Sequence, residues 1–425
     1  MKKILLLISL FISSTVGICQ THTLQEYYNQ AKEAYQAGDH TKFYEMITSA
    51  HKLHPYHQTI LYQAGLASAL TGRSDEAVAY LKKATQIKAD FDLDHGDLKS
   101  LGDREDFKRL KQLQAEWQQP VRNSDTAFVI KDRTLHIESI APGEKGTFYL
   151  GSIHKRKIIR VNEKGEAKDF TASAQDGLTS VFGVKVDLKN NILWACASPM
   201  EEMEHYDTNA VSGVYKYNLK TGKLIAKYVP TDIKKNFVFG DLTLNNKGEV
   251  FVSDSKNNII FKVNEVNSKL EEYFTSEEFW NLQGITFTPD GKFLFIADYI
   301  KGIYRLDTKS KNLIKLDEDF EVSTKSVDGL TFYHNGLIAI QNAIVPMRVT
   351  RYMLNKSQDN LESYVLIDRA HPAFNEPTIG CISGDSFYYV ANSLWSGYTE
   401  QHQLKPLDEL QDVVILKTDL KKFQR

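Results

Sequence analysis

Hydrophobic and polar positions alternate in short runs between residues 281 and 307, which predicts three β-strands joined by tight turns. Gly284 to Phe287 and Ile303 to Leu306 alternate, Phe293 to Ala297 is apolar, and Pro289-Asp290-Gly291 predicts a turn. The pattern occurs six times, at intervals of 44, 58, 43, 45 and 49 residues, with these apolar anchors: Ile140, Val184, Leu242, Ile285, Leu330 and Ile379. A repeated all-β unit of this length predicts a six-bladed β-propeller, because a four-stranded sheet buries both its faces only when neighbours stack around a ring.

Further strands complete each predicted blade. A second apolar strand such as Phe251 to Asp254 follows the anchor, and a third such as Ile259 to Lys262 comes next. A closed ring also needs a seam. We expect the strand-like segment Ala127 to Ile130, which precedes the first copy, to form the outer strand of the last blade and leave no free sheet edge.

A helical pattern precedes the propeller, from Leu24 to about Trp117. Gly38 and Gly72 are 34 residues apart, and small or apolar pairs such as Ala50 and Ala84 keep the same offset, which is typical of tetratricopeptide helix pairs. The sequence therefore predicts a helical domain at 22–118 and a propeller at 124–425. The helices either bind a peptide or protein partner or serve as a spacer packed on the propeller.

The N-terminus predicts export. Met1-Lys2-Lys3 precedes the apolar run Ile4 to Ile12, and small residues lead to a cleavage point after Cys19, which indicates a secretory signal peptide at 1–19. Lipid attachment at Cys19 is the less favoured alternative, because Ile18 stands where such a site needs a small side chain. No later segment is long and apolar enough to span a bilayer, so we expect a periplasmic or secreted protein.

Composition and charge narrow the classes of partner. Hydrophobic residues make up 42% and charged residues 25% of the chain, an ordinary globular mixture. Removing the signal peptide leaves 50 basic and 54 acidic residues, so no cationic surface predicts nucleic acid or an anionic membrane as a partner. Cys196 and Cys381 fall on blades that are not adjacent, which favours buried free thiols over a disulfide.

The residues two places before the anchors enter the innermost strands and converge on the channel mouth. They are Glu138, Phe182, Gly240, Gln283, Asp328 and Pro377. Two carboxylates and an amide oxygen facing one small space suit a hard divalent cation; alternatively they cap strands or hold channel water. The polar residues that end the second strands are expected to hydrogen-bond their own turns: Asp254, Asp298, Asn342 and Asn392.

Several of these segments resemble one family. The segments are Glu138-Ser-Ile, the run from Phe148 to Arg160, Gln283-Gly-Ile, Asp328-Gly-Leu, the run from Ile338 to Asn342, Glu376-Pro-Thr-Ile-Gly380, and the run from Tyr388 to Trp395. Together they resemble the senescence-marker-protein (regucalcin), gluconolactonase and luciferin-regenerating-enzyme family, over roughly Thr126 to Lys417. The resemblance implies a six-bladed propeller with calcium or another divalent ion in its channel, and hydrolysis of lactones or related esters.

By this resemblance Glu138 and Asp328 are metal ligands, and Asp328 is also the general base. Gln283 and Gly240 stand where the family usually has asparagine: glutamine is a longer amide that offers its oxygen from a shifted point, and glycine offers none. The implied mechanism is metal-assisted attack of water on a lactone carbonyl.

Candidate substrate-binding residues come from loops near the mouth and from the resemblance: Trp194, Tyr299, Asn342, Arg348 and Trp395. The alternative for the large aromatic residues among them is packing between blades, which is their more common role in propellers. The insertion Pro199 to Ser212, rich in acidic residues, is either a lid over the channel or a solvated loop. The alternative function is a non-catalytic binding or scaffold protein, because both the propeller and the helical domain are common interaction elements.

Overall fold

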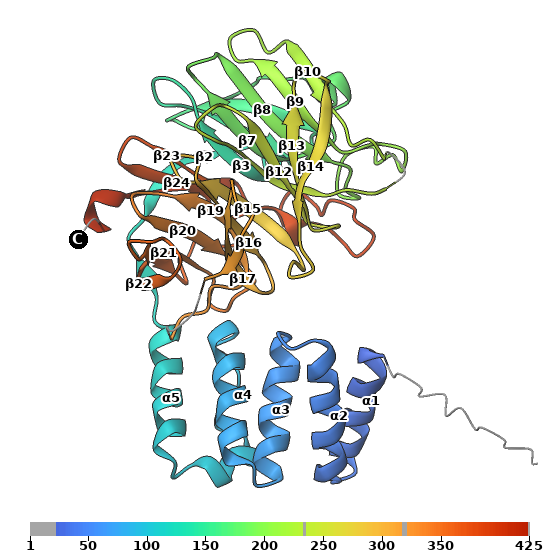
Figure 1. The fold of residues 1–425 in the computed structure, drawn as a ribbon, viewed down its shortest axis with the longest axis vertical. Coiled ribbons are helices and arrows are strands. Elements are labelled where there is room, and N and C mark those ends of the chain that lie inside the picture. Colours follow the sequence, from blue (N-terminus) through green and yellow to red (C-terminus); the bar gives the residue numbers. More distant parts are fainter. Residues whose placement is uncertain (1–22, 233–234, 317–320, 424–425) are drawn as a thin grey trace, which may run out of the picture.

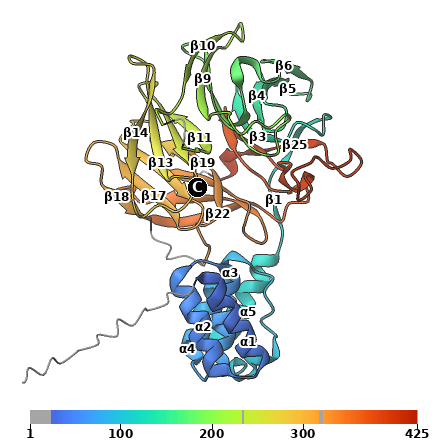
Figure 2. The ribbon, with the colours of Figure 1, turned by 90° about the vertical axis from the view of Figure 1, so that its right-hand side faces the viewer.

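The computed structural model describes residues 23–232, 235–316 and 321–423. The predicted signal peptide, residues 1–19, lies outside the described residues. Figure 1 shows a row of helices on one side of a ring of sheets, and Figure 2 shows the same arrangement turned by 90°. The helices are α1 (Leu24–Gln36), α2 (His40–Leu53), α3 (Gln58–Leu70), α4 (Ser74–Ile87) and α5 (Glu105–Gln118), with a 3-10 helix at Gly96–Leu101.

Local sequence explains where these helices begin, turn and pack. Thr23 and Glu26 form a capping box at the start of α1, each side chain accepting a hydrogen bond from the other's backbone N–H. Gly38 and Gly72 follow α1 and α3 with φ of 72° and 76°, a left-handed conformation that glycine adopts without strain. At Gly65 an added Cβ would lie 2.6 Å from Leu81 Cγ, so glycine is needed for α3 and α4 to approach this closely.

The strands form six antiparallel sheets, which confirms the predicted six-bladed propeller. Blade 1 contains β3 (Ile137–Pro142), β4 (Thr147–Ser152), β5 (Lys157–Asn162) and β6 (Ala167–Asp169). Blade 2 contains β7 (Ser180–Asp187), β8 (Ile192–Ser198), β9 (Gly213–Asn218) and β10 (Leu224–Tyr228). Blade 3 contains β11 (Phe239–Leu244), β12 (Val250–Asp254), β13 (Ile259–Asn264) and β14 (Lys269–Thr275).

The remaining blades follow in chain order. Blade 4 contains β15 (Leu282–Phe287), β16 (Phe293–Asp298), β17 (Gly302–Asp307) and β18 (Leu313–Lys315). Blade 5 contains β19 (Val327–Phe332), β20 (Gly336–Gln341), β21 (Arg348–Leu354) and β22 (Leu361–Arg369), and β1 (Val121–Arg122) pairs with β22 as a fifth strand. Blade 6 contains β23 (Gly380–Ser383), β24 (Ser386–Val390), β25 (Val413–Asp419) and β2 (Asp125–Ile130).

The seam closes as the sequence predicts, because β2 pairs with β25. The core of the ring is divided among the six junctions between neighbouring blades, each filled by its own hydrophobic cluster. This explains why most strands are buried on both faces. Cys196 and Cys381 are buried free thiols, as expected.

The helical region packs on the propeller through a small apolar contact and a pair of backbone hydrogen bonds. Leu61, Ala84 and Ile87 pack against Ile344. Ala89 N–H donates to the carbonyl oxygen of Val345 at 2.8 Å, and Val345 N–H donates to that of Ile87 at 2.9 Å. The loop from 342 to 346 therefore contacts the helices at one end and the channel mouth at the other.

No helix among the described residues is both long and apolar enough to cross a membrane.

Candidate functional site

A cavity of about 480 Å³ lies at the mouth of the channel. It is lined by Glu138, Phe182, Met200, Val238, Gly240, Ser255, Lys256, Asn281, Gln283, Tyr299, Asp328, Asn342, Ala343, Glu376 and Trp395. Five of the six positions two residues before the anchors are in this set. Pro377 is not, but its neighbour Glu376 takes that place.

Asp328 enters the cavity from the start of β19. Its Oδ2 accepts a hydrogen bond from Asn342 Nδ2 at 2.8 Å, and Asn342 Oδ1 in turn accepts one from the Tyr299 hydroxyl at 2.6 Å. Burial raises the pKa of the Asp328 carboxyl to about 7, and the charges of Asp241 and Glu376 add to the effect while Asn342 opposes it. A carboxyl with this pKa can accept a proton at neutral pH.

Glu138 lies on β3, on the opposite side of the ring from blade 4, and is 5% exposed. Its Oε2 accepts hydrogen bonds from Ser393 Oγ at 2.6 Å and from Trp395 Nε1 at 3.2 Å. Burial raises the pKa of the Glu138 carboxyl well above its usual range, and the charge of Asp328 adds to this. The two carboxyls therefore share one electrostatic environment.

Gln283 and Gly240 fit one another in space. A Cβ added at Gly240 would lie 2.9 Å from Gln283 Oε1 and 2.9 Å from Ser255 Oγ. Gln283 Nε2 donates to Asn281 Oδ1 at 2.7 Å, which fixes the amide and leaves Oε1 beside Gly240. The Gln283 amide therefore occupies the space that a side chain at position 240 would fill.

Glu376 is a site residue that the search for residues two places before the anchors did not select. Its backbone has φ of 59°, an uncommon left-handed conformation for a residue other than glycine. Its Oε2 is buried and has no hydrogen-bond partner among the described residues, and burial raises the pKa of its carboxyl. The sequence feature that could have identified it is the segment Glu376-Pro-Thr-Ile, in which the carboxylate stands one residue before the expected position.

Three of the five candidate substrate-binding residues line the cavity: Tyr299, Asn342 and Trp395. Trp194 does not, because its side chain is 1% exposed and packs between blades 2 and 3 with Tyr228. Arg348 also lies outside the cavity, buried on β21, where it donates to Gln341 Oε1 at 2.9 Å and to the Ser323 carbonyl oxygen at 2.8 Å. The expectation that these two residues line the mouth is wrong: both belong to the packing of the blades.

Of the four polar residues that end the second strands, only Asn342 bonds side chains of the cavity. Asp254 and Asp298 accept hydrogen bonds from backbone N–H groups of the turns that follow them, as expected. Asn392 does not bond its own turn: it accepts from the Val414 N–H and donates to the Asp412 carbonyl oxygen. Asn342 instead directs both ends of its amide to Asp328 and Tyr299.

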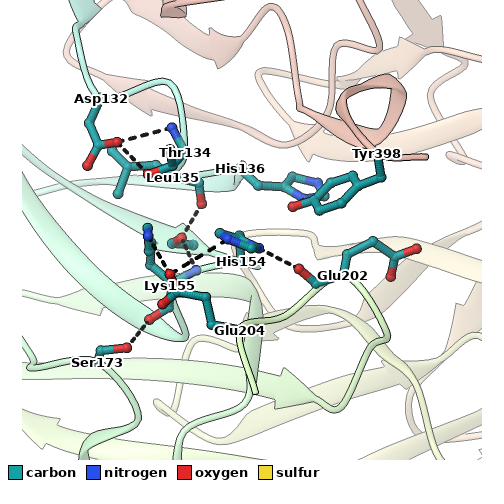
Figure 3. Close-up of polar contacts among 11 residues, drawn as sticks. Asp132, Thr134, Leu135, His136, His154, Lys155, Ser173, Glu202, Glu204 and Tyr398 are labelled. Carbon is teal, nitrogen blue, oxygen red and sulfur yellow. Dashed lines mark hydrogen bonds and ion pairs between the residues drawn. The ribbon is translucent and has the colours of Figure 1, made fainter. Parts of the chain in front are cut away.

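The insertion at 199–212 is anchored to its neighbours (Figure 3). Glu204 forms an ion pair with Lys155, and the Glu202 carbonyl oxygen lies 2.6 Å from His154 Nδ1. On its other side, His402 bridges Glu201 and Glu202 at 2.8 Å and 2.7 Å. Three of its acidic side chains, Glu201, Glu202 and Glu204, are therefore engaged in ion pairs. Met200 reaches the cavity wall.

The oxygen atoms of the cavity have the chemistry of ligands for a hard divalent cation. One oxygen on each predicted ligand, Glu138 Oε1, Gln283 Oε1 and Asp328 Oδ1, has no hydrogen-bond partner among the described residues. Within those residues, no three side chains of the His, Cys, Asp and Glu types gather closely enough to hold a metal by themselves. An ion bound here would therefore need amide oxygens or water as well as carboxylates.

The chain matches no family model. It also matches no curated protein sequence. Among solved structures it is similar to a gluconolactonase from Xanthomonas campestris, with 11% identity and a TM-score of 0.46 over 68% of this chain and 88% of that one. A catalytically inactive virginiamycin B lyase from Staphylococcus aureus with quinupristin has 13% identity and a TM-score of 0.47, over 71% and 98%. A nidogen/laminin complex has 16% identity and a TM-score of 0.45, over 65% and 99%. Likenesses this weak carry no argument about activity.

Proposed function

We propose that this chain is an exported hydrolase that opens a lactone or a related ester in the channel cavity, with a divalent metal ion, calcium first among the candidates. The observation that carries the proposal is the Asp328 carboxyl, which faces the cavity with its pKa raised to about 7. The resemblance of the segments around Glu138, Gln283 and Asp328 to the gluconolactonase family supports the same reaction.

In this proposal Asp328 removes a proton from the attacking water at its Oδ1, the oxygen that Asn342 leaves free. Asn342 and Tyr299 fix the orientation of the carboxylate through their hydrogen bonds. Trp395 and Phe182 supply apolar walls that restrict water around the substrate.

Glu138, Gln283 and Asp328 are the residues that would hold the metal, with Glu376 close enough to add its charge to theirs. A bound divalent cation would supply polarisation of the scissile carbonyl and stabilisation of the oxyanion. Burial is the main reason why the pKa values of the three carboxyls are raised, and for Glu138 and Asp328 the charges of neighbouring carboxyls add to it. A cation bound among them would favour their charged forms.

Hydrolysis of a panel of γ-lactones, δ-lactones and aryl esters tests this proposal. The metal-depleted protein is compared with protein reloaded with calcium, manganese or zinc. We expect metal-dependent turnover that falls about 10²- to 10⁴-fold in Asp328→Asn, the usual contribution of a general base. Asp408→Asn, an exposed acid outside the cavity, is the matched control and should keep the wild-type rate. Turnover that survives Asp328→Asn would contradict the proposal.

A second candidate function is a binding protein in which the helices and the propeller hold one partner together. The observation that favours it is the position of the tetratricopeptide-like hairpins beside the mouth: the Trp280 ring packs edge-on against His54 at 5.4 Å and Tyr56 at 5.7 Å. Trp280 immediately precedes Asn281, which lines the cavity. A panel without any turnover, together with a peptide or protein captured through α1–α4, would favour this second function.

A further inference from the structure

The wall of the channel cavity is divided by polarity. Its polar side chains come mainly from blades 4 and 5 and from the segment before blade 6: Asn281, Gln283, Tyr299, Asp328, Asn342 and Glu376. Across the cavity, blade 2, the insertion at 199–212 and the segment before blade 3 supply Phe182, Met200 and Val238. Glu138 of blade 1 and Ser255 of blade 3 border this apolar side. A ligand that fills the cavity therefore meets polar groups at one end and apolar groups at the other.

The apolar side is one continuous surface. Its side chains belong to a single hydrophobic cluster at the junction of blades 2 and 3, which includes Phe182, Met200, Phe237, Val238 and Trp395. Met200, Val238 and Trp395 are half-buried and line the cavity, so part of their apolar surface faces the cavity and not the core. Covering this surface with an apolar group of a ligand is favourable, because it removes apolar area from water.

A second cavity, of about 400 Å³, continues the apolar side over blades 2 and 3. It shares Met200, Val238 and Lys256 with the channel cavity, so the two spaces are neighbours at these side chains. Further apolar residues of its wall are Pro199, Ala210, Val211 and Phe237. A ligand that passes Met200 and Val238 therefore enters a second space with a partly apolar wall.

The charged groups of the second cavity are paired or exposed. His402 bridges Glu201 at 2.8 Å and Glu202 at 2.7 Å. Lys235 and Lys256 are exposed, so their ammonium groups can remain in water while their methylene stems border the cavity. An apolar group that enters here covers half-buried apolar side chains and leaves these charges paired or solvated.

The position of Asp328 determines which end of a substrate reaches the second cavity. Asp328 belongs to blade 5, which lies across the ring from blade 2. When the reacting carbonyl lies beside Asp328 and Gln283, the far end of the substrate points toward blades 2 and 3. A polyhydroxylated lactone would place hydroxyl groups against Phe182 and Met200, where these side chains offer no hydrogen bond.

We propose that the substrate of the channel site is a lactone or ester with an apolar substituent of several carbons, which lies on Phe182, Met200 and Val238 and extends into the second cavity. This proposal rests on the proposed hydrolase function for the place of the carbonyl, whereas the apolar side is observed independently of any reaction. The flexible Met200 side chain can adjust to substituents of different shape.

Calorimetric titration of the full chain carrying Asp328→Asn tests this proposal, because without the general base the ligands stay intact. The ligands are γ-butyrolactone, γ-decalactone, which is the same ring with a hexyl side chain, and glucono-δ-lactone. We expect γ-decalactone to bind about 10²-fold more tightly than γ-butyrolactone, since each buried CH₂ group favours binding about three- to fourfold and part of the chain stays exposed. Glucono-δ-lactone should bind no more tightly than γ-butyrolactone.

Variants made in the same background place the substituent. Ala210→Trp fills the second cavity from the insertion and should weaken binding of γ-decalactone about tenfold. Met200→Gln should do the same by exchanging an apolar wall for an amide, whereas Met200→Leu should stay within about threefold. The control is Ala167→Trp, at an exposed alanine of β6 outside both cavities, which should bind γ-decalactone as the parent protein does.

Equal affinities for γ-decalactone and γ-butyrolactone, or tighter binding of glucono-δ-lactone, would overturn the proposal. So would equal losses of γ-decalactone binding in Ala210→Trp and Ala167→Trp. Turnover by the metal-loaded wild-type chain separates this proposal from the hydrolase function. Preferential binding of γ-decalactone by a protein that hydrolyses none of the lactones would reject the hydrolase and support the apolar subsite.

Discussion

At the scale of single residues, the candidate site depends on carboxyl groups that the fold brings into one small space. The sequence predicted Glu138, Gln283 and Asp328 at the mouth because each stands two places before an apolar anchor, and all three line the cavity. It did not predict the roles of Asn281 and Glu376, since their positions depend on loop conformation, including the left-handed φ of Glu376. Trp194 was misplaced because an aromatic residue on a blade strand has the same local pattern whether it faces a channel or a neighbouring blade.

The first prediction concerns stability and pH. The raised pKa means that the folded protein binds the Asp328 proton more tightly than the unfolded chain does. This proton binding stabilises the fold fully below the unfolded pKa of about 4, and the stabilisation is lost as pH rises through about 7. Asp328→Asn should therefore stabilise the metal-free protein by about 1–3 kcal/mol at pH 8 and have little effect at pH 4. Urea unfolding at the two pH values measures this, and an equal effect at both would show that Asp328 titrates normally.

The second prediction concerns the fit between Gly240 and Gln283. Gly240→Ala places a methyl group 2.9 Å from Gln283 Oε1 and from Ser255 Oγ, so the amide must move. We expect the affinity for calcium or manganese to fall about tenfold by calorimetry, because one ligand oxygen is displaced. Gly96→Ala, where an added Cβ meets nothing within 4 Å, is the control. An unchanged affinity would remove Gln283 from the set of ligands.

At the scale of elements, the innermost strands determine the site and the connecting loops modify it. The spacing of the anchors was enough to predict six blades and the seam between β2 and β25. It did not predict β1 as a fifth strand of blade 5, because two residues carry too little pattern. The ion pairs of the 199–212 insertion could not be predicted from sequence either, because its partners Lys155 and His402 are distant along the chain.

The third prediction concerns that insertion. The hydrogen bond to Glu202, with the charges of Glu202 and Glu201, raises the pKa of His402. A histidine with a raised pKa stabilises the fold fully below its unfolded pKa of about 6.5, and this contribution disappears as pH rises through the folded value. His402→Gln should therefore speed hydrogen exchange in residues 199–212 at pH 6 and change it little at pH 9. His205→Gln, an exposed histidine in the same insertion, should change neither. Equal acceleration at both pH values would mean that charge plays no part in the anchoring.

At the scale of the whole molecule, the helical hairpins meet the propeller at one side (Figure 2). The contact lies beside the channel mouth, because Ile344 in the contact directly follows Ala343 in the cavity lining. Both parts could be predicted from sequence, because each has its own hydrophobic period. Their contact could not, since it depends on loop residues such as Trp280 and Ile344 that follow no periodic pattern.

The fourth prediction concerns this contact. Trp280 packs against His54 and Tyr56, and Lys301 Nζ lies 5.1 Å from its ring centroid. Trp280→Ala should loosen the helices from the propeller and increase hydrogen exchange in the turn between α2 and α3 by about tenfold, without loss of helix content by circular dichroism. Exchange that stays at the wild-type level would show that the contacts around Ile344 and Val345 hold the interface without Trp280.

The central claim is that Glu138, Gln283 and Asp328 would hold one divalent cation in the channel cavity, with the charge of Glu376 beside them. Calorimetric titration of the metal-depleted protein with calcium, at pH 6 and pH 8 and in buffers of different ionisation enthalpy, tests it most directly. We predict one ion per chain, tighter binding at pH 8 because the carboxyls must lose protons first, and release of protons on binding. Binding should be lost in Asp328→Asn and kept in Asp408→Asn. The absence of any saturable site for calcium, manganese or zinc, or an affinity that does not depend on pH or on Asp328, would contradict the account.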